Sequence, residues 1–339
     1  MELSSPSGNT LSNGGSSPIV SVVIPALNEE RNLPHVFAAL PEGIDEVVLV
    51  DGGSVDDTVA VARRLRPEVV VVQQTRTGKG NALACGFAAC TGDIIVMIDA
   101  DGSTDPAEIP RFVARLVAGD DFVKGSRFSH GGHSHDITKL RKLGNDGLNL
   151  VVNVLFGTRF ADLCYGYNAF WRRVVPSLRL PDIALPRPTG GGKLWGDGFE
   201  IETMINIRAA VDGMTVGEVG SVEHARIHGV TNLNTFRDGF RVLRTIFSEY
   251  GRMRGHRAAR RSGRVLAYPA AAPAAARRDQ NLTTPAVTRR DQNLNTPAAA
   301  AHPADPRSTT AHLNHAIFEV RTRRAGDVKR LPARAALED

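Results

Sequence analysis

An unbroken apolar run, Ile94–Ile98, ends in two aspartates one residue apart, Asp99 and Asp101, and this feature limits the possible folds more than any other in the chain. A continuous apolar run of this length is typical of a strand buried on both faces, as in a parallel sheet covered by helices. In open α/β sheets, ligands bind at the carboxyl ends of the strands, where both carboxylates would lie. Oxygen ligands at this spacing suit Mg²⁺ or Mn²⁺ shared with substrate phosphates. Taken alone, the pair fits a helix cap equally well, since Asp101, Ser103 and Asp105 precede a helix expected to begin near Pro106.

The strand that ends at Asp99 is the fourth in a repeated pattern. Apolar runs at 19–24, 46–50 and 69–72 precede it, and the polar turn after each run leads into a predicted helix. Strands and helices that alternate at this spacing favour the α/β class. We therefore expect a single domain with a mostly parallel central sheet and helices on both faces.

Short stretches rich in polar and charged residues follow these strands. Because parallel strands end at one edge of a sheet, we expect the residues in these turns to lie close together. They are Pro25, Ala26, Asn28, Glu29, Asp51, Lys79, Asp99 and Asp101.

Composition divides the chain into three parts. Residues 1–18 are rich in Ser, Gly and Asn, and residues 255–339 are rich in Ala, Arg and Pro, with the hexapeptide at 277–282 repeated at 289–294. Two short copies cannot bury a core, and both terminal segments have the composition of disordered chain. We expect the folded domain to span residues 19–254.

Charge and cysteine content exclude several classes of function. From Gly251 onward the chain has 17 Lys and Arg against 7 Asp and Glu, which leaves 24 against 29 in the first 250 residues. The predicted domain therefore lacks the basic surface that binding to nucleic acid requires. Three cysteines without a paired spacing indicate neither a disulfide framework nor a zinc site, and no segment is typical of a signal peptide or a spanning helix. We expect a cytoplasmic protein whose contact with a membrane, if any, is peripheral.

Taken in order, the motifs resemble those of the family 2 glycosyltransferases, which have the GT-A type of nucleotide-sugar-binding fold. Within that family the chain is similar to the branch of dolichyl- and polyprenyl-phosphate glucosyl- and mannosyltransferases. The matching stretches are residues 23–30, 50–58, 78–82, 99–102 and 125–127, Asp162 with 166–170, then 199–202 and Arg226 with Gly229.

The resemblance implies a role for each residue at the sheet edge. Pro25, Ala26, Asn28 and Glu29 would border the nucleotide, and Lys79 would add positive charge near the base or the diphosphate. Asp51 would accept a hydrogen bond from the base, although a turn residue is the alternative at a strand end. Asp99 and Asp101 would hold a Mg²⁺ or Mn²⁺ ion that neutralises the leaving nucleotide, with Asp101 counted among the catalytic residues.

The acceptor determines which further residues matter. If it is a polyprenyl phosphate, Arg127 and Arg226 would bind phosphate groups, and no general base is needed because the attacking oxygen is already ionised. If it is a hydroxyl, Asp197 or Glu200 would have to take its proton. Each of these residues also has an ordinary interpretation. The two arginines could be surface residues, and the two acidic residues could simply begin a helix.

The leading hypothesis is an inverting, metal-dependent transfer of a hexose from a nucleotide diphosphate sugar such as UDP-glucose to a polyprenyl phosphate. The alternative keeps the fold and donor but uses a soluble hydroxyl acceptor in glycan or natural-product synthesis. A sugar nucleotidyltransferase would need a Gly-rich loop after the first strand, which Pro25–Asn28 does not provide. A nucleotide-sugar binder without activity is a further alternative, and only turnover excludes it.

Two further segments have candidate roles. His130, His133 and His135 could hold a metal, but without a fixed element we interpret their loop as a mobile cover for the substrate. In the amphipathic segment 140–156, one apolar set offers a path for a lipid tail. Its members are Leu148, Val151, Val152, Leu155 and Phe156.

Overall fold

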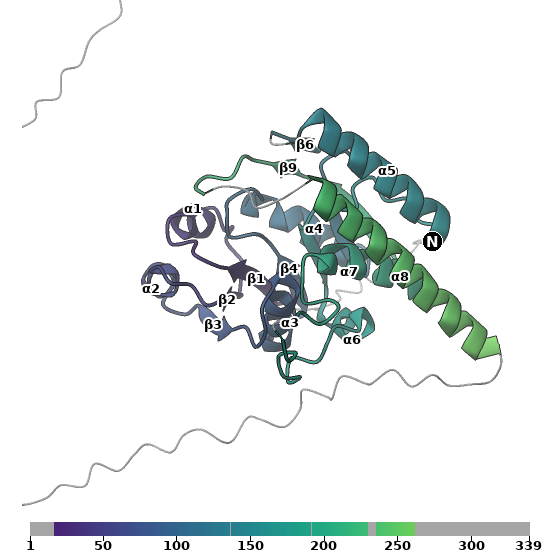
Figure 1. The fold of residues 1–339 in the computed structure, drawn as a ribbon. Helices are drawn as coiled ribbons and strands as arrows, with labels where there is room; N and C mark the ends of the chain where they lie inside the picture. Colours follow the sequence, from purple (N-terminus) through teal and green to yellow (C-terminus); the bar gives the residue numbers. More distant parts are fainter. Residues whose placement is uncertain (1–16, 136, 191, 230–234, 262–339) are drawn as a thin grey trace, which may run out of the picture. The chain divides into compact units, whose positions relative to one another are not determined.

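The computed structural model describes residues 17–135, 137–190, 192–229 and 235–261 (Figure 1). All of them belong to the first of the two units into which the chain divides, Met1–Arg278. The predicted terminal segments therefore lie almost entirely outside the described residues. Of the helices in the described part of the chain, none is long and apolar enough to cross a membrane.

The predicted parallel sheet is confirmed. Within the described residues it contains seven strands in the order β3-β2-β1-β4-β7-β5-β8, and all of its neighbouring pairs are parallel except the two that β7 makes. The strands are β1 (Val20–Ala26), β2 (Glu46–Asp51), β3 (Val70–Gln73), β4 (Ile94–Met97), β5 (Phe122–Ser126), β7 (Asn168–Trp171) and β8 (Val216–Gly220).

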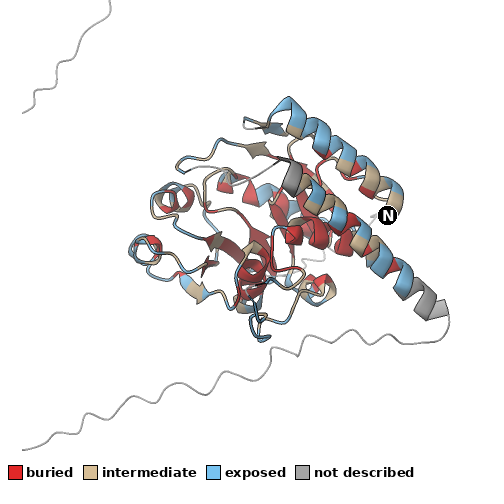
Figure 2. Ribbon diagram, viewed as in Figure 1, coloured by how far each residue is buried: buried red, intermediate tan, exposed pale blue. Residues whose placement is uncertain are grey.

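Helices cover both faces of this sheet, and Figure 2 shows the strands between them as buried. Side chains that alternate along β1 belong to different cores: Val22 and Ile24 face one way and Val23 the other. The first face packs against α1 (Leu33–Ala38), α2 (Thr58–Leu65) and α4 (Ile109–Val117), and the second against α3 (Lys79–Ala89), α6 (Val175–Leu178) and α7 (Glu200–Val211). Two short 3-10 turns, Pro106–Glu108 and Arg172–Val174, precede α4 and α6.

A third core lies between α7 and two long helices that run side by side, α5 (Lys139–Phe156) and α8 (Thr235–Arg261) (Figure 1). Helix α8 continues beyond residue 254, where we expected the folded domain to end. The residues that we interpreted as a path for a lipid tail pack into this third core instead, so that interpretation is wrong. They are Leu148, Val151, Val152, Leu155 and Phe156.

Strand β7 was not among the strands that the sequence predicted. This strand lies between β4 and β5 and runs antiparallel to both. Its four residues are too few for a recognisable alternation, and its place depends on partners far away in the sequence. A second, small sheet pairs β6 (His133–Ser134) with β9 (Val222–Glu223).

Candidate active site

The carboxyl ends of β3, β2, β1 and β4 lie next to one another, because these four strands are parallel neighbours. Ala26 at the end of β1 is in register with Asp51 at the end of β2. The turns after these strands, together with Lys79 at the start of α3, therefore meet at one edge. The structure thus brings together the residues that we expected there, from Pro25 to Asp101.

The turns after β1 and β2 hold each other in place. Asn28, whose φ of 59° is unusual for a residue other than glycine, accepts a hydrogen bond from the Val55 amide through its side chain and donates its own amide to Ser54 Oγ. The Glu29 amide donates to Thr58 Oγ1 at 2.8 Å. These hydrogen bonds join the two turns into a rim at the edge of the sheet.

Asp51 is buried at the bottom of that rim. Its carboxylate accepts hydrogen bonds from the amides of Gly53 and Ser54 and from Gln73 Nε2 at 2.9 Å. Burial alone would raise the pKa of Asp51, but the hydrogen bonds from Ser54, Gln73 and Gly53 outweigh it and hold the pKa below the usual value. The carboxylate is therefore charged at neutral pH and is held in a fixed position.

Lys79 links two carboxylates at the start of α3. Its Nζ lies 2.6 Å from Asp99 Oδ1 and 2.5 Å from Glu202 Oε1 of α7. Although burial alone would lower the pKa of Lys79, the two carboxylates raise it, so the ammonium group stays charged. Burial raises the pKa of Asp99; Lys79 opposes that shift, while the nearby Asp101 and Glu202 carboxylates add to it.

Arg226 links two other carboxylates. Its Nη2 lies 2.7 Å from Asp101 Oδ2, and its Nη1 lies 3.4 Å from Glu29 Oε1. Burial raises the pKa of Glu29, and the hydrogen bond from the Asn32 side chain and the Arg226 charge oppose the shift only in part. Each aspartate of the Asp99/Asp101 pair thus has its own cationic partner within the protein.

The segment His224–Gly229, which we call the strap, carries Arg226 across this edge. The His224 amide donates to Ser103 O and the Ile227 amide to Asp101 O, so the strap is bound to the turn that holds the aspartates. At its other end the His228 amide donates to Asn32 Oδ1. Movement of the strap would therefore change the position of Arg226 relative to Asp101.

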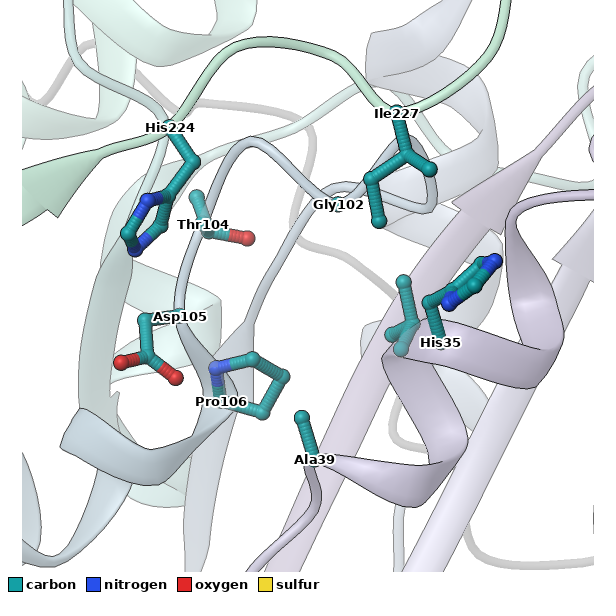
Figure 3. A pocket seen from close by; sticks show the side chains of 9 residues that line it. His35, Ala39, Gly102, Thr104, Asp105, Pro106, His224 and Ile227 are labelled. Carbon is teal, nitrogen blue, oxygen red and sulfur yellow. The ribbon is translucent and has the colours of Figure 1, made fainter. Parts of the chain in front are cut away.

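A cavity of about 360 Å³ lies beside the strap, between α1 and the turn after Asp101 (Figure 3). The side chain of Thr104 faces it, and the Thr104 hydroxyl is buried without a hydrogen-bond partner. The residues that line the cavity are His35, Val36, Ala39, Gly102, Thr104, Asp105, Pro106, His224 and Ile227.

Asp99 and Asp101 fit a divalent cation that binds together with a substrate diphosphate. Their side chains keep 30% and 13% of their surface exposed, so both can be reached from solvent. Mg²⁺ and Mn²⁺ commonly take one or two carboxylates and complete their coordination with phosphate oxygens and water. The described residues contain no cluster of three or more His, Cys, Asp or Glu that could hold a metal alone. His133, His135 and His224 pack ring against ring instead.

Arg127 is already held by two carboxylates. It makes a bidentate pair with buried Asp162, at 2.7 and 2.9 Å, and its Nη1 lies 3.1 Å from both carboxylate oxygens of Glu223. To bind a phosphate group, Arg127 would have to exchange Glu223 for that group while it keeps Asp162. Glu223 belongs to β9, which directly precedes the strap.

Asp197 and Glu200 serve the fold in this structure. Buried Asp197 makes a bidentate pair with buried Arg76 at 2.8 and 2.9 Å, and its backbone oxygen accepts from the amides of Gly80 and Asn81. Glu200 Oε1 accepts from the amides of Gly196 and Gly198 at 3.0 and 3.1 Å, which fixes the loop before α7. Both carboxylates are thus bound to other groups of the protein.

Sequence reasoning gave no role to four residues that complete this site. Glu202 and Asp162 stood in motifs that we recognised, and their positions in those motifs were the available signal. Arg76 and Glu223 had no such signal, because their partners lie far from them in the sequence. In each case the missing information is a tertiary ion pair.

Comparison with known proteins gives this site a context. Residues 21–178 match the sequence model of glycosyl transferase family 2. An uncharacterized glycosyltransferase of Mycobacterium tuberculosis is 48% identical over 108 residues, which cover 32% of this chain and 48% of that protein. An undecaprenyl-phosphate 4-deoxy-4-formamido-L-arabinose transferase of Pseudomonas fluorescens is 31% identical over 170 residues, which cover 47% of this chain and 49% of that protein. The chain thus spans about half the length of these two relatives.

Among solved structures, the chain is similar to glucosyl-3-phosphoglycerate synthase of Mycobacterium tuberculosis in complex with Mn²⁺, UDP and glucosyl-3-phosphoglycerate. The TM-score is 0.53 at 25% identity, with 69% of this chain and 80% of that chain covered. The same enzyme has also been solved with Mg²⁺ and UDP. The likeness agrees with the GT-A type of fold that the sequence predicts.

Proposed function

Because the chain contains a domain of glycosyl transferase family 2, matched over residues 21–178, we propose that it moves a hexose from a nucleotide diphosphate sugar to a polyprenyl phosphate. UDP-glucose or a similar donor is favoured. Transfer in one displacement, with inversion at the sugar carbon, needs no covalent intermediate with the protein. It needs a bound donor, a neutralised leaving group and an ionised acceptor.

The edge formed by the strand ends supports the assignment of a nucleotide-sugar donor. Pro25, Ala26, Asn28 and Glu29 would border the nucleoside, and the charged, fixed carboxylate of Asp51 would accept a hydrogen bond from the base. Lys79 would hold positive charge beside the diphosphate while it keeps Asp99 and Glu202 in position. Arg226 would donate to the diphosphate oxygens.

Asp99 and Asp101 are the residues that would hold Mg²⁺ or Mn²⁺, which would neutralise the charge that grows on the leaving nucleoside diphosphate. The similar synthase binds Mn²⁺ or Mg²⁺ together with UDP, which supports the same use of a divalent cation here. Before the cation binds, Lys79 and Arg226 balance the charge of the two aspartates. This arrangement keeps two carboxylates stable near each other in the free protein.

One observation favours a phosphate acceptor: the two general bases that the sequence suggested, Asp197 and Glu200, are bound to other groups of the protein. A phosphate oxygen is ionised near neutral pH, so it attacks without a base. Arg127, held by Asp162 and able to exchange Glu223, would orient that phosphate. The name of the Pseudomonas relative, an undecaprenyl-phosphate transferase, supports the same acceptor class.

A hydroxyl acceptor is the second candidate. The similar synthase was solved with glucosyl-3-phosphoglycerate, the product of transfer to a small phosphorylated acid. In that case Glu202, a partly exposed carboxylate beside Asp99, is the best placed residue to take the proton. Its salt bridge to Lys79 disfavours this role, because that contact already engages one of the two carboxylate oxygens.

An acceptor comparison with one variant tests the proposal. The full chain, Mn²⁺ and a panel of nucleotide sugars are incubated with a short polyprenyl phosphate, with 3-phosphoglycerate or with water, and released nucleoside diphosphate is measured. We expect release with the lipid phosphate, and Glu200→Gln should change that rate less than about threefold. Transfer to 3-phosphoglycerate but not to the lipid phosphate would replace our proposal with the second candidate.

A further inference from the structure

Helix α5 carries a second apolar row on the side opposite to its packed face. Leu140, Leu143, Leu150 and Val154 are 55 to 73% exposed. Residues spaced three, four or seven apart lie on one side of a helix, so these four form a single row. Single exposed apolar residues are ordinary on a protein surface, but a row along one helix marks a place of interaction.

Helix α8 carries a similar row beside it. Phe240 and Phe247, seven residues apart, are 70% and 54% exposed. Tyr250, which neighbours Phe247 on the helix surface, contacts Phe156 of α5 with ring centroids 5.8 Å apart. The aromatic row of α8 therefore borders α5, and Figure 2 shows large exposed areas on both helices. We call the two rows the docking face, which comprises Leu140, Leu143, Leu150, Val154, Phe240 and Phe247.

The charges around the docking face identify the kind of partner. Among the described side chains of α5 and α8, seven are basic and two are acidic. Lys142 pairs with Asp146, and Arg252 pairs with buried Glu249, which also holds Arg208, so positive charge remains in excess on these helices. The basic residues are Lys139, Arg141, Lys142, Arg241, Arg244, Arg252 and Arg254.

We propose that the docking face binds the surface of an anionic membrane. Leucine, valine and phenylalanine side chains would enter the boundary between head groups and acyl chains, and the lysines and arginines would meet the anionic head groups. A second copy of the chain is a poorer partner, because face-to-face contact would bring two positive surfaces together.

The position of the docking face also relates it to the active site. Helix α5 begins shortly after Ser134, whose hydroxyl donates to the Glu223 carboxylate that holds Arg127. Binding of a membrane to α5 would therefore place lipid head groups near Arg127. The inference does not depend on the proposed acceptor, because vesicles without any polyprenyl phosphate suffice to test it.

Vesicle flotation with a matched pair of variants provides the test. The docking variant is Leu143→Glu with Val154→Glu, and the control is Leu65→Glu with Val117→Glu, which changes an exposed leucine and valine on α2 and α4. We expect wild type and control to float with vesicles of phosphatidylcholine and phosphatidylglycerol, but not with phosphatidylcholine alone. The docking variant should bind at least about tenfold more weakly, and added salt should weaken binding by the wild type.

A milder change, Leu150→Ser, and thermal unfolding of each variant separate lost binding from lost folding. Equal binding by the docking variant and the control would overturn the proposal, as would a wild type that does not bind anionic vesicles. If sedimentation instead shows a dimer that the docking variant turns into a monomer, without vesicle binding, the face is an interface between copies and the membrane assignment is wrong.

Discussion

Replacement of Arg226 by alanine should tighten the binding of Mn²⁺ alone but weaken the binding of UDP in the presence of Mn²⁺. In the structure Arg226 Nη2 lies 2.7 Å from Asp101 Oδ2, where it neutralises one of the two proposed metal ligands. Without nucleotide, a divalent cation and Arg226 compete for the same carboxylate. With nucleotide bound, the guanidinium can donate to the diphosphate, so Arg226 then favours the binding of nucleotide together with the cation.

The size of both effects follows from the environment of the pair. Both side chains are partly exposed, so the ion pair contributes about 1 kcal/mol, near the upper end for a solvated pair. Its loss should therefore tighten the binding of Mn²⁺ alone about fivefold. A hydrogen bond from arginine to phosphate contributes about 1.5–3 kcal/mol, so the same variant should bind UDP in the presence of Mn²⁺ about tenfold to a hundredfold more weakly.

Calorimetric titration measures both constants, first with Mn²⁺ alone and then with UDP at saturating Mn²⁺. Arg173→Ala is the matched control, because Arg173 pairs with Asp121 on the surface instead of with a residue of the candidate site. It should change neither constant. If Arg226→Ala weakens the binding of Mn²⁺ alone, Arg226 does not compete with the cation and the reasoning is refuted.

Three further changes test other parts of the account. Asp197→Asn should lower the free energy of unfolding in urea by about 3–5 kcal/mol, because it leaves the buried charge of Arg76 without its carboxylate partner. Loss of turnover without loss of stability would instead indicate a catalytic role. Gly166→Ala would place a Cβ 2.6 Å from Glu202 Oε1 and so displace that carboxylate. We expect kcat/KM to fall while the melting temperature changes little, and an unchanged kcat/KM would refute the importance of Glu202. The pKa of Asp51 is lowered in the folded chain, so its hydrogen bonds stabilise the fold at any pH above the usual carboxyl pKa of about 4. That stabilisation is lost as the pH falls through the lowered pKa of the folded state. Asp51→Asn should therefore flatten the acid side of a plot of melting temperature against pH, and an unchanged slope would contradict this.

The sequence was sufficient to predict the part of the fold that local patterns determine. Apolar runs that each end in a polar turn predicted parallel strands, and parallel strands require their ends to meet, so the pattern alone placed Asp51 and Asp99 at one edge of the sheet. Strand β7 escaped prediction because its direction is set by β4 and β5 and not by its own four residues.

The candidate site was predictable to the same extent. The motif positions of Lys79 and Arg226 placed them near the aspartates, but no local pattern showed that each would bind one of them. Asp197 and Glu200 were considered as bases because a hydroxyl acceptor would need one. Their actual partners, Arg76 and two backbone amides, could be seen only in the folded chain.

The most direct test of the central claim is the mass of the lipid product. The full chain is incubated with UDP-glucose, Mn²⁺ and a short polyprenyl phosphate, and the lipid fraction is analysed by mass spectrometry alongside the UDP released. Our account predicts a lipid heavier by one hexose residue, formed in equal amount to the UDP and absent with EDTA or with Asp101→Asn. An unmodified lipid under conditions in which the protein transfers the same sugar to a hydroxyl acceptor would contradict it.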